Sequence, residues 1–336
     1  MKKFHTASIV LGMVFLLYLI WDIGPRRLFE EFRTIGWGLL PLVLIEGVAD
    51  IFHALGWRHC LTGTQRELSF FRIYRIRMSG FSINYLTPTA TLGGEVTKGT
   101  LLSSGNKPAG AVTSVVIGKL AYVLAQLIFV ALGSIATLWK VDLPSGVWPA
   151  MLLSSAILAL GIFSFLLVQK YGKLGALVRW LVLHKIGGKL LENAASHITE
   201  IDNELKLFYS RHPKDLPIAV GWHILGMSCG ILQAWYFFYL VSDQPSLVVA
   251  ASVWFLGSWF DLLSFAIPMS IGVQEATRIL AFNALGYGSL MGLTYGVALR
   301  IEQIFWASFG LLCYATLISE KQKAEMEINI KEGSPS

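Results

Sequence analysis

The sequence predicts an all-α polytopic membrane protein whose two halves form an inverted-topology repeat, each half carrying one re-entrant or broken helix element. Three observations predict this fold. Of the 336 residues, 54% are hydrophobic and only 14% are charged, against about 25% charged residues in typical soluble domains. The apolar residues form runs of about 20, the length that a spanning helix needs. One short pattern of proline, glycine, glutamate and a cation occurs twice among these runs.

The first half, residues 1–168, is expected to contain four spanning helices and the first broken element. The broken element covers about Met78–Ser104, where Pro88 and the Gly93–Gly94 pair interrupt an apolar stretch and favour a re-entrant hairpin. An arginine-rich loop, Arg58–Arg77, precedes it, and a short charged connection lies at Gly24–Thr34. The four expected spanning helices are about Phe4–Ile23, Ile35–Trp57, Ala109–Trp139 and Val147–Val168.

A cytoplasmic connector, residues 169–214, is expected to join this half to the second half, residues 215–318. The connector is rich in Lys and Arg, and its apolar residues recur at helical spacing, which predicts amphipathic helices on the membrane surface. The second half has two expected spanning helices, about Leu216–Val241 and Ser289–Ile318, and a second broken element, about Leu247–Leu285. The polar residues 319–336 are expected to be a disordered tail, so residues 1–318 form a single transmembrane domain.

Two copies of one pattern lie within the broken elements. In each copy six residues separate a proline from a glutamate, and a small residue, a threonine and a cation follow the glutamate. An ionised group within an apolar stretch is costly and is usually present for function. The first copy contains Asn84, Pro88, Gly93, Gly94, Glu95 and Lys98, and the second contains Pro268, Gly272, Glu275 and Arg278.

Loop charges predict the orientation of the helices. Segments rich in Lys and Arg face the cytoplasm, which places both termini, the Arg58–Arg77 loop and the connector on that side. Every element of the second half then runs in the opposite sense to its counterpart in the first half, which is the plan of many secondary transporters. In each half a further cation follows the motif glutamate at nearly equal spacing, and these cations are Lys119 and Arg300.

The repeated pattern predicts a polar chamber that binds lipid. A helix that starts at Gly93 or Gly272 directs free N–H groups and the positive end of its dipole at the chamber. The cations could therefore bind an anion such as a lipid phosphate, while the glutamates orient the cations, accept hydrogen bonds or carry protons. The alternative is a self-neutralising ion pair in each motif, because glutamate and cation are three residues apart on one helix face. The candidate cations are Lys98, Lys119, Arg278 and Arg300.

A second polar group lies in the helix expected at Ile35–Trp57. Glu46, Asp50 and His53 share one face of this helix. They form a proton relay or contact a cationic headgroup, or else they face water near the cytoplasmic end. Two carboxylates and one imidazole are weak evidence for a metal, and no P-loop, nucleophile elbow or dinucleotide motif occurs, so we expect no metal, cofactor or catalytic residue. His223, alone in its helix, is expected to make a polar packing contact.

The chain resembles the flippase-like family named for the transmembrane region of lysylphosphatidylglycerol synthase. The resemblance covers about residues 5–318 and rests on the two motifs and the order of the spans. It implies a polytopic membrane protein that binds or moves lipids, such as aminoacylated phosphatidylglycerol or lipids of hopanoid and polyprenyl-linked glycan pathways. Synthase members append a soluble aminoacyl-transferase domain, and because this chain ends soon after its last expected helix, we expect no aminoacyl transfer. The site positions that the resemblance implies are Asn84, Pro88, Gly94, Glu95, Pro268, Gly272 and Glu275.

These observations together predict a bacterial inner-membrane lipid transporter of the flippase type. Its substrate is expected to be an amphipathic lipid with an anionic headgroup, or a hopanoid or polyprenyl-linked lipid, moved by alternating access. Two other hypotheses stay open: a membrane enzyme that modifies lipid headgroups with Glu and His as acid and base, and a scaffold that recruits lipid-biosynthesis enzymes through the connector. The expected partners are membrane lipids and such enzymes, and the diffuse net charge of +6 does not favour nucleic acid.

Overall fold

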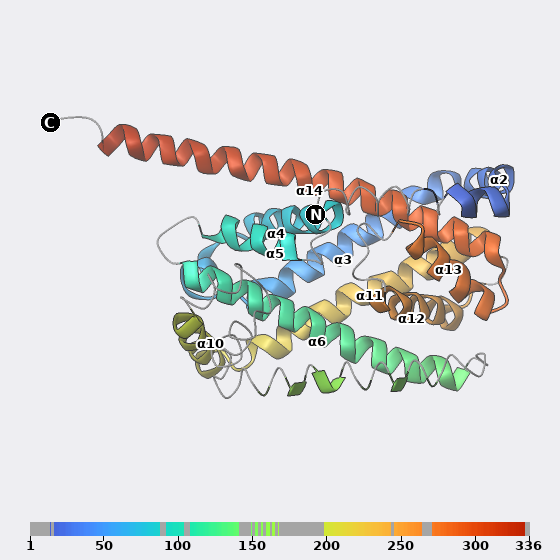
Figure 1. The fold of residues 1–336 in the computed structure, drawn as a ribbon, viewed down its shortest axis with the longest axis horizontal. Helices are drawn as coiled ribbons and strands as arrows, with labels where there is room; N and C mark the ends of the chain where they lie inside the picture. The colour runs from blue at the N-terminus through green and yellow to red at the C-terminus, as the bar shows by residue number, and fades with distance from the viewer. Residues whose placement is uncertain are drawn as a thin grey trace.

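Helices dominate the chain because its apolar runs are long, and because backbone N–H and C=O groups within a bilayer must find partners inside the segment itself. The computed structural model describes residues 17–87, 92–103, 108–140, 198–242, 245–263 and 271–332, and single positions at 14 and between 149 and 167. Helices and short turns make up these residues, with no strand among them, which confirms the predicted all-α class. Figure 1 shows the longest helices lying side by side, with the C-terminal helix extending beyond the others.

Four segments are long and apolar enough to cross a membrane: Pro25–His59, Gly110–Thr137, Asp215–Val241 and Ser289–Lys323. They contain the long helices α3 (Leu39–His59), α6 (Pro108–Lys140), α11 (Asp215–Val241) and α14 (Ser289–Glu332). These helices agree with four of the expected spans to within a few residues at most ends. The other two expected spans, at 4–23 and 147–168, lie mostly outside the described residues.

Each broken element is a pair of helices. The first pair is α4 (Phe70–Leu86) and α5 (Leu92–Leu102), and the second pair is α12 (Leu247–Leu263) and α13 (Val273–Ala284). The breaks fall where the sequence predicts them, although Pro88 and Pro268 themselves lie outside the described residues. The two pairs lie toward opposite ends of the bundle (Figure 1). Re-entrance of the pairs, the inverted repeat of the halves and the orientation in the membrane all stay predictions.

Two segments expected to be irregular are helical. The charged connection at Gly24–Thr34 forms α2 (Pro25–Ile35), which has proline at its first turn, a position where the missing N–H costs nothing. The expectation of a disordered tail is wrong as far as Glu332, because α14 continues to that residue. The tail consists mainly of Glu, Lys, Gln, Ala and Met, which are strong helix formers, and it contains no glycine or proline before position 333.

Helix α4 begins eight residues earlier than the expected broken element. The Ser69 hydroxyl accepts a hydrogen bond of 3.3 Å from the backbone N–H of Arg72, and this side-chain cap starts the helix at Phe70. As a result Arg75 and Arg77, which the sequence places in a cytoplasmic loop, lie on a packed helix. Arg77 is only 16% exposed in its side chain, so it belongs to the interior of the bundle.

Helix α14 contacts both helix pairs. It packs against α13 and α4, while α3 and α11 pack along each other in opposite chain directions. Glycines allow these close crossings. A Cβ atom on Gly296 would lie 3.1 Å from the Cα of Glu275, and one on Gly310 would overlap the backbone carbonyl of Met78. The same helix therefore sets the positions of the two motif regions.

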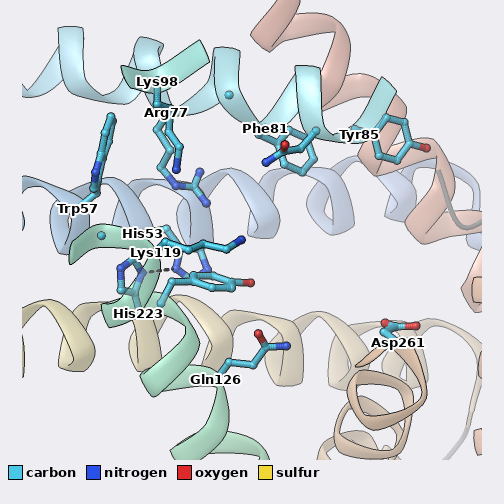
Figure 2. A pocket seen from close by; sticks show the side chains of 14 residues that line it. His53, Trp57, Arg77, Phe81, Tyr85, Lys98, Lys119, Gln126, His223 and Asp261 are labelled. Carbon is cyan, nitrogen blue, oxygen red and sulfur yellow. Dashed lines mark hydrogen bonds between the residues drawn. The ribbon is translucent and has the colours of Figure 1, made fainter. Parts of the chain in front are cut away.

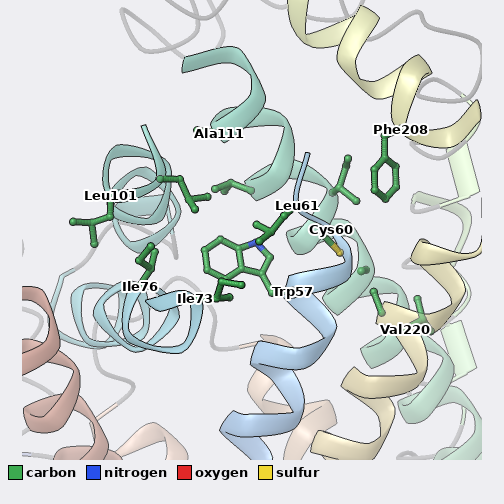
Figure 3. Packing of buried hydrophobic residues seen from close by; sticks show 14 of the residues in the cluster. Trp57, Cys60, Leu61, Ile73, Ile76, Leu101, Ala111, Phe208 and Val220 are labelled. Carbon is green, nitrogen blue, oxygen red and sulfur yellow. The ribbon is translucent and has the colours of Figure 1, made fainter. Parts of the chain in front are cut away.

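Two clusters of buried apolar side chains pack the helices together. One cluster, built around Trp57, joins α3, α4, α5, α6 and α11 (Figure 3). It also receives Phe208 from α10 (Ile198–Arg211), which packs against α6. The other cluster contains Phe237, Phe282 and Tyr295, whose ring centroids lie 5.0–6.0 Å apart. The helix predicted in the connector is thus confirmed at α10, while its place on a membrane surface stays a prediction.

Candidate functional site

A cavity of about 460 Å³ lies among helices α3, α4, α5, α6, α11 and α12 (Figure 2). Its volume falls within the range of about 300–1,000 Å³ that is usual for small-molecule sites. Cationic, aromatic and amide side chains line most of it. The lining residues are His53, Trp57, Arg77, Gly80, Phe81, Asn84, Tyr85, Lys98, Gly118, Lys119, Tyr122, Gln126, His223 and Asp261.

Three cations from three helices converge on the cavity. Arg77 of α4 donates to Asp50 of α3 at 2.5 Å. On α5 and α6, Lys98 and Lys119 share Glu95, with N–O distances of 2.5 Å and 3.6 Å. Lys119 keeps 39% of its side chain exposed, so its ammonium group can reach a molecule in the cavity. These three side chains therefore form a cationic part of the cavity wall, and Asp50 and Glu95 hold them in place.

Aromatic rings support these cations. The ammonium group of Lys98 lies 5.2 Å from the ring centre of Trp57, and that of Lys119 lies 6.0 Å from the ring centre of Tyr122. A cation above an aromatic face is attracted by the ring quadrupole. The rings thus stabilise positive charge in an otherwise apolar bundle and restrict the directions in which the lysines can point.

Backbone contact between α4 and α5 positions the first motif. The Asn84 side-chain carbonyl accepts a hydrogen bond of 2.6 Å from the backbone N–H of Gly94. A Cβ on Gly94 would overlap the carbonyl oxygen of Gly80. The first motif thus needs glycine at position 94 because the two helices touch there, and this contact brings Lys98 to the cavity.

Two histidines form part of the same wall. The Nδ1 atoms of His53 and His223 lie 2.9 Å apart and share a hydrogen bond, for which one ring must donate and the other accept. Tyr122 packs on both rings, with centroid distances of 5.3 Å and 5.4 Å. The expectation that His223 makes a polar packing contact agrees with this geometry, although His223 pairs with a second histidine rather than standing alone.

An acidic residue lies on the far side of the cavity from Arg77 and Lys98 (Figure 2). Asp261 of α12 accepts a hydrogen bond of 2.6 Å from Arg278 of α13. Its side chain is 38% exposed, whereas that of Arg278 is only 10% exposed. Arg278 therefore serves as the counterion of Asp261 and is not itself among the residues that line the cavity.

The second motif glutamate is enclosed. Glu275 is 0% exposed, and its carboxylate accepts two hydrogen bonds from Arg300, at 2.8 Å and 3.1 Å. It also accepts one of 2.8 Å from the backbone N–H of Gly272, which has a φ of +76° that favours glycine. Arg300 also donates a hydrogen bond of 3.2 Å to the Tyr85 hydroxyl. Glu275 thus caps its own helix and fixes Arg300 against the wall of the cavity.

The sequence-predicted site residues separate into groups. Three of them, Asn84, Lys98 and Lys119, line the cavity, and Glu95 holds the two lysines. In the predicted polar group of α3, which consists of Glu46, Asp50 and His53, Asp50 and His53 are buried and Glu46 is partly buried. The burial of Asp50 and His53 is contrary to the alternative that they face water. Six other predicted site residues do not line the cavity: Gly93, Gly94, Gly272, Glu275, Arg278 and Arg300. The predicted residues Pro88 and Pro268 lie outside the described residues.

Several lining residues were not anticipated as site residues. Asp261 stands as a single acid in an apolar run, a signal that could have identified it. Tyr122 and Gln126 follow Lys119 at three- and seven-residue spacing and therefore share its helix face. Arg77 could have been found from the capping serine before α4. The pairing of histidines across two helices has no signal in one sequence.

Family comparison agrees with this architecture. The model of the family described as "Lysylphosphatidylglycerol synthase TM region" matches residues 6–309. The chain belongs to this family. A family relative, described as a UPF0104 membrane protein of Pyrococcus horikoshii, is 22% identical over 322 residues, which are 91% of this chain and 94% of the relative. No solved structure matches the chain.

Membership in the family and the four long apolar helices make the chain a multi-pass membrane protein. The cavity therefore lies among membrane helices, where charged side chains are rare and usually serve function. Within the described part of the chain, no group of three or more His, Cys, Asp or Glu residues is arranged to hold a metal ion.

Proposed function

We propose that this protein binds the anionic headgroup of a membrane lipid in the cavity and moves the lipid between leaflets by alternating access. The convergence of Arg77, Lys98 and Lys119 on one cavity carries the proposal. Three cations placed together in an apolar bundle repel one another, and such an arrangement is favourable when an anion completes it. A lipid phosphate is the anion that a membrane supplies most abundantly.

The positions of Lys98 and Lys119 suit binding of a headgroup phosphate. Lys119 is partly exposed while its partner Glu95 is 15% exposed, so the ammonium can turn from the carboxylate to a phosphate with little motion. Lys98 is held more tightly, between Glu95 and Trp57. We infer that Lys119 makes the first contact with the headgroup and that Lys98 and Arg77 complete its binding.

The arrangement of the helix pairs supports translocation over static binding. The cavity receives side chains from α4 and α5 of the first pair and from α12 of the second, and the two pairs lie toward opposite ends of the bundle (Figure 1). Movement of either pair would change access to the cavity from its own end. Access that changes separately at two ends would suit alternating access.

Lipid movement in vesicles tests the proposal. Purified protein is placed in phosphatidylcholine vesicles with a trace of fluorescent phosphatidylglycerol, and dithionite quenches the label that reaches the outer leaflet. We expect the native protein to expose the inner label, and the double variant Lys98→Met/Lys119→Met to slow this exposure roughly tenfold or more, as loss of charge contacts in a low-dielectric site implies.

The matched control is Lys206→Met, which removes an exposed lysine from α10 and is expected to keep the native rate. Size-exclusion profiles of all variants check that they fold. Equal rates for the double variant and the native protein would contradict the proposal. A chemically altered headgroup in the mass spectrum of the recovered lipids would instead support a lipid-modifying enzyme.

A further inference from the structure

The histidine pair in the wall of the cavity has a capacity for protons that the proposed function does not use. We propose that His53 and His223 together take up one proton when an anionic headgroup binds in the cavity, so that lipid movement is coupled to proton movement. This inference rests on the proposed function, because it assumes that the cavity receives an anion. It goes further by assigning the proton site and the number of protons that it takes.

The hydrogen bond within the pair leaves one ring nitrogen able to accept a proton. The Nδ1 atoms of His53 and His223 lie 2.9 Å apart, so in the uncharged pair one Nδ1 carries a hydrogen and the other accepts it. A neutral imidazole has one N–H, and the ring that donates from Nδ1 therefore has an unprotonated Nε2. A proton that binds this Nε2 leaves the shared hydrogen bond intact and makes its donor cationic, which strengthens the bond.

A second added proton does not suit the pair. After the first, the nitrogen that is still unprotonated is the Nδ1 that accepts the shared hydrogen bond. Protonation of that atom would set two N–H groups and two positive charges against each other. The pair therefore has room for one proton, which gives the coupling a stoichiometry that can be measured.

Glycines hold the two rings in this arrangement. A Cβ atom on Gly226 of α11 would lie 2.7–2.9 Å from three atoms of the His53 ring, and one on Gly56 of α3 would lie 3.0 Å from Nε2 of His223. Each ring thus packs on a glycine of the opposite helix. The Nε2 atom of His223 is buried and has no hydrogen-bond partner in the described part of the chain, so no other hydrogen bond fixes the proton at that atom.

The pair and the cations of the cavity respond to the same charge. Both rings line the cavity together with Arg77, Lys98 and Lys119 (Figure 2), and Arg77 interacts electrostatically with both rings. These cations repel a proton on the pair, and an anion bound to them offsets that repulsion. Binding of the anion and uptake of the proton therefore favour each other, and the coupling is reciprocal.

Other titratable and charged groups surround the pair and have to be distinguished from it. They are Glu46 and Asp50 of α3, Arg77 of α4, Glu95 and Lys98 of α5, and Lys119 and Tyr122 of α6. Asp50 and Glu95 form ion pairs with the cations. Glu46 interacts electrostatically with Arg77, and it is therefore the acid that could take up the proton in place of the pair.

Calorimetry of lipid binding tests the inference. Purified protein is titrated with a short-chain phosphatidylglycerol in two buffers of different ionisation enthalpy, and the difference in heat gives the number of protons taken up per lipid bound. The probe is a phosphodiester, whose own charge does not change near neutral pH. We expect uptake of up to one proton, and an affinity that rises from about pH 8 to about pH 6 by at most roughly tenfold per pH unit, because a single proton is involved.

Variants identify the group that takes the proton. The double variant His53→Gln/His223→Gln removes both imidazoles, while its amides can still hydrogen-bond to each other. It should bind the lipid without proton uptake and with an affinity that does not vary over the same pH range. His212→Gln, which changes a 40% exposed side chain after α10, is the matched control and should keep the native uptake. Glu46→Gln tests the rival acceptor and should also keep it.

A ligand control and a direct readout complete the test. A short-chain diacylglycerol, which lacks the phosphate, should bring no proton to the native protein. If the double variant does not fold, nitrogen NMR of native protein with labelled histidine decides instead. The signal of a charged imidazole must then appear when phosphatidylglycerol is added, and its absence would overturn the inference.

Failure of the inference differs from failure of the proposed function. Binding of phosphatidylglycerol without proton uptake would overturn the inference and leave lipid binding intact. Proton uptake that persists in the double variant, or that is lost in Glu46→Gln alone, would also overturn it. Binding of no lipid by the native protein would overturn the proposed function and, with it, this inference.

Discussion

The two copies of the motif have nearly the same sequence pattern but different surroundings. In the first copy, Glu95 shares its carboxylate between two lysines that line the cavity, and Lys119 remains partly open to it. In the second copy, Glu275 is completely enclosed and binds Arg300 with both oxygens. One copy places charged side chains at the cavity, whereas the other neutralises charge within the protein.

A repeated sequence pattern therefore does not imply a repeated set of contacts. The sequence suggested either two equal halves of a binding chamber or two self-neutralising pairs. The i,i+3 pair forms only in the first copy, between Glu95 and Lys98. In the second copy Arg278 instead binds Asp261, so the charged partner that reaches the cavity is an acid. The second motif therefore reaches the cavity only through Asp261, the partner of Arg278, among the lining residues that the structure describes.

Removing the enclosed glutamate should have the largest effect. Glu275→Gln leaves Arg300 buried without a full counterion, and breaking a buried pair in this way costs about 3–5 kcal/mol of unfolding free energy. Denaturation in mixed detergent, followed by tryptophan fluorescence, measures the loss. Glu95→Gln should cost clearly less, because Lys119 can remain hydrated through the cavity.

The control for this comparison is the double variant Glu275→Gln/Arg300→Met, which removes both partners and should recover much of the lost stability. Equal losses for Glu275→Gln and Glu95→Gln would contradict the division between an enclosed motif and an open one.

A methyl group at the crossing of α4 and α5 should have an intermediate effect. Gly94→Ala introduces a Cβ that overlaps the backbone carbonyl of Gly80, and such overpacking costs about 1–3 kcal/mol. Thermal unfolding and lipid binding should both be weakened, because separation of the helices moves Lys98 from the cavity.

The same helix contains a matched control. A Cβ on Gly99 would meet nothing within 4 Å, so Gly99→Ala should be neutral or should stabilise α5 by up to about 1 kcal/mol through helix propensity. A Gly94→Ala variant as stable as Gly99→Ala would show that the two helices do not cross closely at this point.

Loss of one hydroxyl at the junction of the motifs should have the smallest effect. Tyr85→Phe removes the hydrogen bond from Arg300 at 3.2 Å, which is expected to cost about 0.5–1.5 kcal/mol of unfolding free energy. Tyr74→Phe, on the same helix but without a bond to Arg300, is the control. If the two variants unfold alike, Tyr85 does not connect the enclosed motif to the cavity.

Much of the fold followed from the sequence because periodicity and run length are local properties. The ends of α6 and α11 differ from expectation by one residue or none, and both breaks fall in the proline segments. Spacing also anticipated that Lys119 and Arg300 would meet the motif glutamates. These pairings could be predicted because each cation follows its motif glutamate at nearly the same spacing, 24 residues for Lys119 and 25 for Arg300.

The residues that line the cavity were harder to predict from the sequence, because the cavity depends on contacts between helices that are distant in the chain. No sequence pattern indicates that Arg278 would turn to Asp261, or that His53 and His223 would share a hydrogen bond. The arginine-rich composition of residues 58–77 predicts a loop at Arg77, whereas the cap at Ser69 starts α4 before it. Long-range packing, which a single sequence does not show, decided the pairings of Arg278 and of the two histidines, whereas the placement of Arg77 followed from the local cap at Ser69.

The continuity of α14 has a mechanical consequence. It touches the second helix pair near Gly292 and the first pair near Gly310, which lie about 27 Å apart along the axis at about 1.5 Å per residue. Arg300 lies between these two attachments. Under the alternating-access mechanism proposed above, a tilt of α14 about Arg300 would move its two attachments in opposite directions. Such coupling would disfavour simultaneous opening at both ends of the bundle, and so would prevent a continuous leak.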